Sequence, residues 1–365
     1  MNLSLGIVGL PNVGKSTLFN ALTKQSVPAE NYPFCTIDPN VGIVAVSDAR
    51  FESLVQSANP AKVTPAVVEF VDIAGIVKGA HAGEGLGNAF LAHIRNVNVV
   101  IEVIRVFPDK SVTHVHEKIN PLYDKEVIES ELILKDLETI ESRYTKLRKE
   151  AKSDKSKEKF VKELDEIKKS LEQGKLANSY QTDPTQKDLL ESRKELFLLT
   201  DKQFIYLVNG DWLNVGTDLA GKLRKELGID EGFPILPINI ALEYELCMMN
   251  LEEKENFMSE LGMTFSGLEE LTRIGYRLLD LISFFTVGPE EVKAWTIKRG
   301  TNAPQAAGVI HTDFEKKFIT AEVANINDYL ENPDWPALKE KGKVALEGRD
   351  YIVKDGDVII FRHGA

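Results

Sequence analysis

Short runs of apolar residues, each ending in polar or turn-forming residues, occur between residues 3 and 106 and again at residues 204–208. The first run, residues 3–8, meets a glycine-rich turn, and a helical pattern follows over residues 15–24. This order predicts the strand, loop and helix that open an α/β nucleotide-binding domain. Residues 67–71, 97–106 and 204–208 are rich in β-branched or aromatic side chains and are predicted as further buried strands. Parallel sheets bind ligands at the carboxyl ends of their strands, so the polar residues after these runs form the candidate site.

The pattern changes between residues 113 and 197. Apolar residues such as Ile128, Leu132 and Ile140 recur there at helical spacing, and charged residues are densest between positions 146 and 175. The spacing predicts two long helices, packed as an antiparallel pair and inserted between strands of the nucleotide-binding domain. The charged stretch is interpreted as a solvated helix face, and a docking surface is the alternative.

Short alternating strands are predicted from residue 282 to residue 365. Residues 351–353 and 358–361 flank a turn sequence at residues 354–357, which predicts a hairpin in a small α+β domain. Lysines and an arginine surround Trp295 in the same segment. They are candidates for holding an RNA backbone, and a solvated face over a core tryptophan is the alternative.

Composition is that of an ordinary globular protein with more than one domain. The 365 residues are 43% hydrophobic and 27% charged, and the formal net charge is −12. Such acidity argues against non-specific binding to nucleic acid, and no DNA partner is expected, although a local basic patch stays open. Cys35 and Cys247 form no disulfide or metal-ligand pattern, which favours a reducing compartment. No apolar stretch approaches the ~20 residues that span a bilayer, so a cytoplasmic protein without a membrane partner is expected.

A phosphate-binding loop follows the first predicted strand. The sequence Gly9-Leu10-Pro11-Asn12-Val13-Gly14-Lys15-Ser16 matches GxxxxGK[ST], in which backbone N–H groups at a helix N-terminus surround the phosphates. Lys15 is expected to reach the β- and γ-phosphates and is a candidate catalytic residue, and Ser16 offers its hydroxyl to Mg²⁺. The candidate nucleotide-binding residues of this loop are Asn12, Val13, Gly14, Lys15, Ser16 and Thr17.

Two further segments complete a predicted Mg²⁺ site. Asp72 directly follows the strand at residues 67–71, at the position where GTPase-like P-loop proteins hold Mg²⁺. Thr36 lies between the two motifs, where a first switch segment belongs, and is the candidate for a second hydroxyl ligand. The expected metal ligands are therefore Ser16, Thr36 and Asp72. The alternatives are an ordinary loop threonine and a strand-end turn aspartate.

These segments resemble the Obg-like ATPase (YchF) family. The resemblance rests on the phosphate loop and on four further motifs: Asn31-Tyr32-Pro33-Phe34-Cys35-Thr36-Ile37, Asp72-Ile73-Ala74-Gly75, Val292-Lys293-Ala294-Trp295-Thr296-Ile297 and Ala303-Pro304-Gln305-Ala306-Ala307-Gly308. It implies an α/β fold, with a P-loop GTPase-type nucleotide domain, an inserted helical coiled coil and a C-terminal β-grasp (TGS) domain. It also implies Mg²⁺-dependent hydrolysis of ATP in preference to GTP, and association with the ribosome or its large subunit. The expected domains are residues 1–112 with 198–281, residues 113–197 and residues 282–365.

The segment that reads the base in GTPases departs from their NKxD motif. The chain reads Asn209-Gly210-Asp211-Trp212, so glycine and tryptophan stand at the lysine and aspartate positions. Trp212 cannot accept hydrogen bonds from guanine, whereas Asn209 carries the donor and the acceptor needed to pair with adenine. Asn209 and Gly210 are the candidate base-loop residues for ATP. Asp211 is the rival, because a one-residue shift in register brings its carboxylate to guanine.

The usual water-activating residue is missing. Ile76 stands where many GTPases have a glutamine, so intrinsic hydrolysis is expected to be slow. His81, on the following glycine-rich loop, is the candidate catalytic side chain, and an ordinary exposed histidine is the alternative. Asn12 is a candidate to help hold K⁺ near the phosphates.

Three functions fit these residues. An ATP-hydrolysing, ribosome-associated regulatory switch is favoured, because an intact phosphate site is joined to a missing guanine reader. The alternatives are a nucleotide-gated binding protein whose hydrolysis is incidental, and a GTPase of ribosome assembly.

Overall fold

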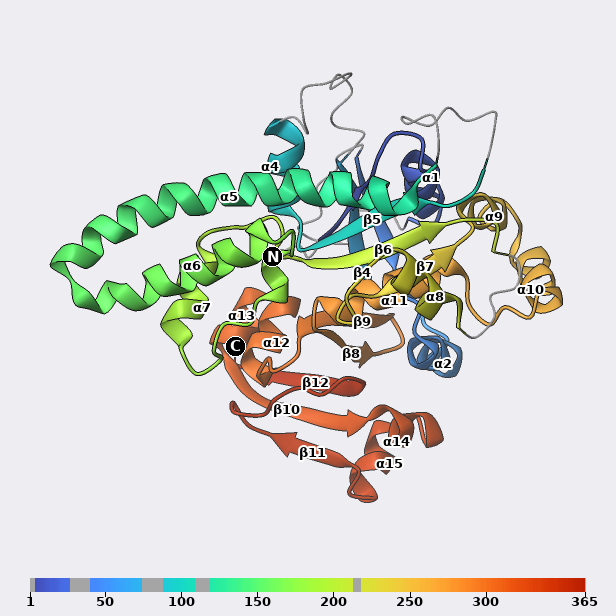
Figure 1. Cartoon of the computed structure of the whole chain (residues 1–365). Coiled ribbons are helices and arrows are strands. Elements are labelled where there is room, and N and C mark those ends of the chain that lie inside the picture. The colour runs from blue at the N-terminus through green and yellow to red at the C-terminus, as the bar shows by residue number, and fades with distance from the viewer. Residues whose placement is uncertain (1–3, 27–39, 74–87, 109–118, 213–217, 365) are drawn as a thin grey trace. The chain divides into compact units, whose positions relative to one another are not determined.

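The computed structural model describes residues 4–26, 40–73, 88–108, 119–212 and 218–364 (Figure 1). Contacts divide the chain into two compact units. Unit 1 comprises Met1–Lys24, Asp38–Gly42 and Phe70–Gly267. Unit 2 comprises Gln25–Ile37, Ile43–Glu69 and Leu268–Ala365.

The first sheet lies mostly in unit 1. Its strands are β1 (Ser4–Val8), β2 (Val41–Ala45), β4 (Val67–Asp72), β5 (Val99–Arg105), β6 (Gln203–Asn209) and β7 (Ile235–Ile238). The helices of unit 1 are α1 (Lys15–Lys24), α4 (Asn88–Asn96), α5 (Pro121–Ser153), α6 (Glu158–Glu172), α7 (Lys187–Lys194), α8 (Leu219–Glu226), α9 (Ile240–Leu246) and α10 (Leu251–Glu260), with 3₁₀ turns η2 (Lys155–Lys157) and η3 (Ala177–Ser179).

The strand order brings the carboxyl ends of three neighbouring strands to one edge of this sheet. The order is β2-β4-β1-β5-β6-β7, and β5 pairs in parallel with both β1 and β6. Every residue of β1 and β5 is buried, which is why these strands read as nearly continuous apolar runs. The four strands predicted from the sequence and the helix predicted over residues 15–24 are confirmed. The carboxyl ends of β1, β5 and β6 meet at the edge from which the phosphate loop leaves.

The predicted helical insertion is also confirmed. Asn120 caps α5 by accepting a hydrogen bond from the backbone N–H of Tyr123, and Pro121 occupies the first turn, where no donor is lost. At 1.5 Å per residue, the 33 residues of α5 span about 50 Å. Helix α6 folds back along α5 to form a hairpin (Figure 1). The apolar residues buried in the pair include Leu132, Ile140, Leu147, Leu164 and Ile167.

Unit 2 is a mixed sheet with short helices. Its strands are β3 (Lys62–Thr64), β8 (Leu281–Val287), β9 (Glu291–Lys298), β10 (Phe318–Asn325), β11 (Val344–Glu347) and β12 (Asp357–His363). Its helices are α2 (Ala49–Ala58), α11 (Gly267–Leu278), α12 (Ala303–Ile310), α13 (Thr312–Lys316), α14 (Ile326–Glu331) and α15 (Trp335–Glu340). The strand order is β11-β10-β12-β8-β9-β3, and β12 lies parallel to β8 but antiparallel to β10. Since β3 pairs with β9, the sheet of unit 2 includes residues that the expected division assigns to the nucleotide-binding domain. The expected domain boundaries stay a prediction.

The hairpin predicted around residues 354–357 is wrong. Residues 351–353 are not the partner of β12, because their backbone bonds to residues 301–303 instead: Val353 N donates to Thr301 O at 3.0 Å, and Ala303 N to Tyr351 O at 2.8 Å. The turn itself is present, since Lys354 N donates to the Asp357 side chain. The local strand–turn–strand signal therefore identified a turn but not the long-range partners of β12.

Trp295 lies within the sheet of unit 2. Its ring stacks on Phe284 at a centroid distance of 6.3 Å, and its Nε1 donates to Thr286 Oγ1 at 2.9 Å. The ammonium of Lys293 lies 3.9 Å from the ring centroid. These contacts favour the core-tryptophan interpretation over a free stacking platform. Among the helices of the described residues, none combines the length and apolarity needed to cross a bilayer.

Candidate nucleotide-binding site

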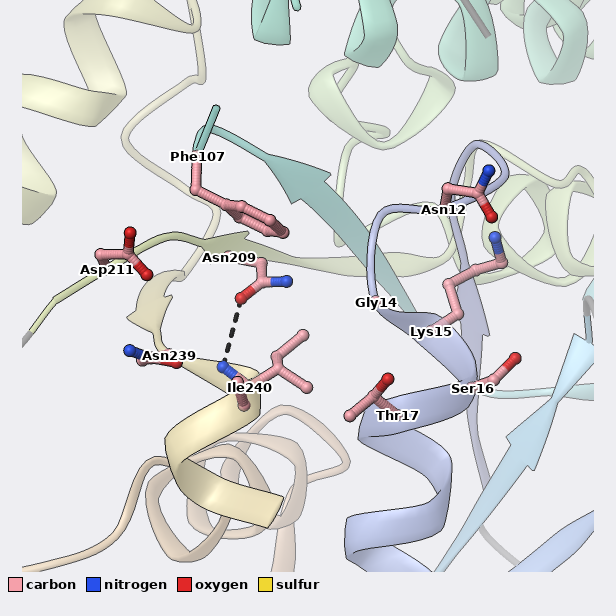
Figure 2. Close-up of a pocket in the computed structure, with 11 residues that line it drawn as sticks. Asn12, Gly14, Lys15, Ser16, Thr17, Phe107, Asn209, Asp211, Asn239 and Ile240 are labelled. Carbon is pink, nitrogen blue, oxygen red and sulfur yellow. Dashed lines mark hydrogen bonds between the residues drawn. The ribbon is translucent and has the colours of Figure 1, made fainter. Parts of the chain in front are cut away.

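A cavity of about 330 Å³ lies at the carboxyl edge of the unit 1 sheet (Figure 2). That volume is in the range of small-molecule sites. The lining comes from the phosphate loop with α1, from the ends of β5 and β6, and from the start of α9: Asn12, Gly14, Lys15, Ser16, Thr17, Phe107, Asn209, Asp211, Asn239, Ile240 and Ala241. Figure 2 shows Phe107 and Asp211 on one side of the cavity, with Lys15 and Ser16 on the other.

Two glycines let the phosphate loop turn against the sheet. Gly9 has φ of 147°, and a Cβ there would lie 2.7 Å from the Val103 carbonyl oxygen. Gly14 has φ of 109°, and its Cβ would lie 2.7 Å from Asn209 Nδ2. Side chains are excluded at both positions by conformation and by space. The loop therefore lies close to β5 and β6, and Gly14 lines the cavity.

Lys15 is a buried cation. Its side chain is 8% exposed, and its Nζ donates to the Leu10 carbonyl oxygen at 2.5 Å. Burial lowers the pKa of Lys15 to about 8, an effect that the negative charge of Asp72 only partly offsets. A buried ammonium at the lip of a cavity is stabilised by a bound anion, so this end of the cavity fits phosphate.

The predicted Mg²⁺ ligands are only partly within the described residues. Ser16 is exposed at the cavity, and Asp72 is buried at the end of β4, where its backbone N–H donates to the Asn40 carbonyl oxygen at 3.0 Å. A hydroxyl and a carboxylate are the hard oxygen donors that Mg²⁺ prefers. Thr36 lies outside the described residues, as do Ile76 and His81.

Asn209 holds two loops together. Its Nδ2 donates to the Val13 carbonyl oxygen at 3.0 Å, and its Oδ1 accepts from Ile240 N at 3.2 Å (Figure 2). One N–H and one lone pair of the amide are left for a base. The sequence had assigned Asn209 to adenine alone, whereas in the structure the same amide ties the phosphate loop to the start of α9. Val13 contributes its carbonyl to this contact, and its side chain is buried.

The structure places the base-loop residues differently from what the sequence predicts. The indole Nε1 of Trp212 donates to the Val208 carbonyl oxygen at 3.0 Å, which folds the ring back toward β6. A Cβ on Gly210 would lie 2.7 Å from that indole, so the glycine makes room for it. Asp211 lines the cavity, whereas neither Gly210 nor Trp212 is among the lining residues. Of these three residues, the rival residue Asp211 is thus the one that lines the cavity.

Phe107 is a lining residue that the sequence analysis does not single out. Arg105, at the end of β5, is fully buried and lies 4.4 Å from the centroid of the Phe107 ring. Its guanidinium also donates to the carbonyl oxygens of Phe107 and Asn12, at 3.1 and 3.3 Å. Arg105 therefore fixes the aromatic side chain relative to the phosphate loop. The available signal was an aromatic residue two positions after a buried parallel strand.

The comparisons with known proteins cover the whole chain. A family described as "50S ribosome-binding GTPase" matches residues 4–136, and the C-terminal family of YchF GTPases, described as a protein of unknown function, matches residues 281–364. The "Ribosome-binding ATPase YchF" of Bacillus subtilis is 47% identical over 99% of both chains. The "Obg-like ATPase 1" of Gallus gallus is 46% identical, over 99% of this chain and 92% of that protein. The structure of the Schizosaccharomyces pombe YchF GTPase is 38% identical and superposes with a TM-score of 0.89, covering 99% of this chain and 98% of that one. These similarities confirm the predicted α/β architecture with its helical insertion and TGS-like C-terminal part, and this chain belongs to the YchF and Obg-like ATPase family of P-loop proteins.

Proposed function

We propose that this protein binds ATP with Mg²⁺, hydrolyses it to the diphosphate and phosphate, and prefers ATP to GTP. The observation that carries the proposal is the buried Lys15 at the phosphate end of a cavity whose other end presents an aromatic ring. Relatives 43–47% identical over nearly the whole chain are named ATPases, which supports adenine as the base.

The phosphate end supplies the binding and the charge stabilisation. Lys15 is held by burial close to where the phosphates would lie, and backbone N–H groups at the N-terminus of α1 would donate to them, as in other phosphate loops. Ser16 and Asp72 would hold Mg²⁺, which neutralises charge on the phosphates when bound. Thr36 as a third ligand, His81 as a water-activating side chain and K⁺ held near Asn12 stay predictions.

The base end favours adenine because it lacks a carboxylate at the position where GTPases bind guanine. Guanine presents a ring N–H and an amino group, and GTPases satisfy these with the carboxylate at the last position of NKxD. Trp212 stands at that position, with its own N–H already bonded to the Val208 carbonyl. Guanine donors left unpaired in a buried site would cost about 1–3 kcal/mol. Asp211 lines the cavity, and its carboxylate could accept from both the ring N–H and the amino group of guanine, so the preference for ATP requires that this carboxylate does not reach the base edge.

A prediction follows for the base loop. Replacing Trp212 with Asp should shift the ratio of ATP affinity to GTP affinity toward GTP by about tenfold, because a carboxylate then stands where the GTPase motif has one. The measurement is calorimetric titration of each variant with both nucleotides and Mg²⁺.

Two further variants make this result specific. Trp212→Phe keeps an aromatic side chain that cannot accept hydrogen bonds, so its ratio should match the wild type. Asp211→Asn tests the rival residue. If that change alone abolished GTP binding and spared ATP, Asp211 would be the guanine reader and the assignment to Trp212 would be wrong.

Ribosome association and the role of hydrolysis belong to the same proposal. Proteins named ribosome-binding ATPases match this chain from end to end, so a cytoplasmic, ribosome-associated switch is the function we favour. The alternative functions differ in how ribosomes affect the rate of ATP hydrolysis. A nucleotide-gated binding protein would show the same slow single-turnover rate with and without ribosomes, whereas a ribosome-dependent enzyme would be accelerated.

A further inference from the structure

The end of the helical hairpin carries an excess of positive charge. Residues 143–162, here called the hairpin tip, comprise the last turns of α5, the turn η2 and the start of α6. They include nine lysines and arginines against three acidic residues, a net charge of +6 in a chain whose net charge is −12. Figure 1 shows this end of the hairpin extending beyond the sheet of unit 1.

The basic side chains of the hairpin tip face solvent. Leu147 is buried, whereas Lys146, Arg148, Lys149 and Lys152 around it on α5 are exposed. A residue advances 100° around a helix, so these four side chains cover the faces that Leu147 does not. These four positive charges are therefore displayed outward, and of them Arg148 also lies 5.9 Å from the centroid of the Tyr144 ring.

The hairpin tip differs from the remainder of the hairpin in its ion pairs. Nearer the base of the hairpin, lysines lie 2.5–2.8 Å from carboxylates: Lys135–Glu138, Lys168–Glu141 and Lys169–Asp165. In the tip, Lys159 pairs with Asp188. The other eight basic side chains form no ion pair with any residue that the structure describes.

Unpaired like charges at this spacing destabilise a helix. Lys146, Lys149 and Lys152 follow one another at intervals of three residues, which places them on neighbouring turns. Among the described residues no carboxylate forms an ion pair with these three lysines, so a bound polyanion would relieve their repulsion. Lysines at about 5 Å intervals along a rod can contact successive phosphates of a nucleic acid backbone.

We infer that the hairpin tip binds the phosphate backbone of structured RNA. The inference rests on the proposed ribosome association and names the part of the chain that makes the contact. An acidic chain would otherwise be repelled by RNA, and a +6 segment at the end of the hairpin farthest from the sheet of unit 1 provides a local region of opposite sign. The contact is with phosphates, so it does not depend on the RNA sequence.

The test neutralises three lysines of the tip. The tip variant carries Lys146→Gln, Lys149→Gln and Lys152→Gln. These positions are exposed and glutamine is a good helix former, so the hairpin should fold, which circular dichroism checks. The control variant changes three exposed lysines elsewhere in unit 1 and alters the net charge equally: Lys187→Gln, Lys222→Gln and Lys225→Gln.

Binding is measured by co-sedimentation with purified ribosomes and by titration of protein-free ribosomal RNA at several salt concentrations. The tip variant should bind both at least about tenfold more weakly, and the slope of log K against log salt should flatten by about 2–3, as expected for three lost phosphate contacts. The control variant should match the wild type, and ATP hydrolysis without ribosomes should be the same in all three proteins.

Two results would overturn the inference, and a third would separate it from the proposed ribosome association. Wild-type affinity and salt slope in the tip variant would overturn the inference and leave a solvated face. Weaker ribosome binding without any binding of protein-free RNA would mean an acidic protein partner, which also overturns it. A wild-type protein that fails to bind ribosomes would refute the ribosome association, whereas loss of free-RNA binding in the tip variant would still support the tip as an RNA site.

Discussion

Replacing Lys15 with Met is expected to lower kcat/KM for ATP hydrolysis by about 10²–10³-fold, the loss typical when one charge-stabilising group is removed. Methionine fills a similar volume, so the cavity wall is kept while the cation is lost. Turnover with ATP and Mg²⁺ is the measurement. Lys24→Met, at the exposed end of the same helix, is the matched control and should retain wild-type turnover.

The same variant should be more stable than the wild type when no nucleotide is present. The pKa of Lys15 is lowered from 10.5 to about 8, so the folded state disfavours its charged form. That cost is fully present below pH 8, is relieved as pH rises from 8 to 10.5, and amounts to about 3 kcal/mol at pH 7. Urea unfolding at pH 7 should therefore show a higher midpoint for Lys15→Met. Normal hydrolysis by the variant would refute the phosphate-site assignment, and a lower midpoint would refute the buried-charge account.

The second large effect is expected at Asp136, on the inner face of α5. The carboxylate is 1% exposed and accepts hydrogen bonds from Leu199 N, Thr200 N and Thr200 Oγ1 at 2.7–2.8 Å. These bonds join the long helix to the segment that leads into β6. Asp136→Ala leaves two buried backbone donors without their acceptor, and the free energy of unfolding should fall by about 4 kcal/mol.

Urea unfolding of the variant measures this change. Glu126→Ala, at an exposed position of the same helix, should change the free energy of unfolding by less than about 0.5 kcal/mol. Burial raises the pKa of Asp136, against the effect of its hydrogen bonds. A loss below about 1 kcal/mol in Asp136→Ala would show that the freed donors find other partners, and that the hairpin is not anchored through this carboxylate.

The phosphate half of the site was predictable because its chemistry is local. Lys15 and Ser16 act through a glycine-rich turn between a strand and a helix, and all three elements lie within one short stretch of sequence. The two long helices were equally predictable from the sequence, since their apolar spacing is a property of each helix alone.

The base half depends on residues far apart in the chain. Asn209 bonds to Val13, 196 positions away, whereas the orientation of Trp212 follows from a bond to the Val208 carbonyl, four positions earlier in β6. Neither contact has a signature in the order of residues. Phe107 is positioned by the buried Arg105, and β12 pairs with β10 and β8, to which no turn sequence joins it. The contacts of Asn209 and of β12 are long-range, and the local bonds of Trp212 and Phe107 belong to no motif that the sequence displays.

Calorimetric titration of the wild-type protein with ATP and with GTP, each with Mg²⁺, tests the central claim most directly. The account predicts that ATP binds more tightly by about 5–150-fold, which corresponds to 1–3 kcal/mol of unpaired guanine donors. Tighter binding of GTP, or no binding of either nucleotide, would contradict it.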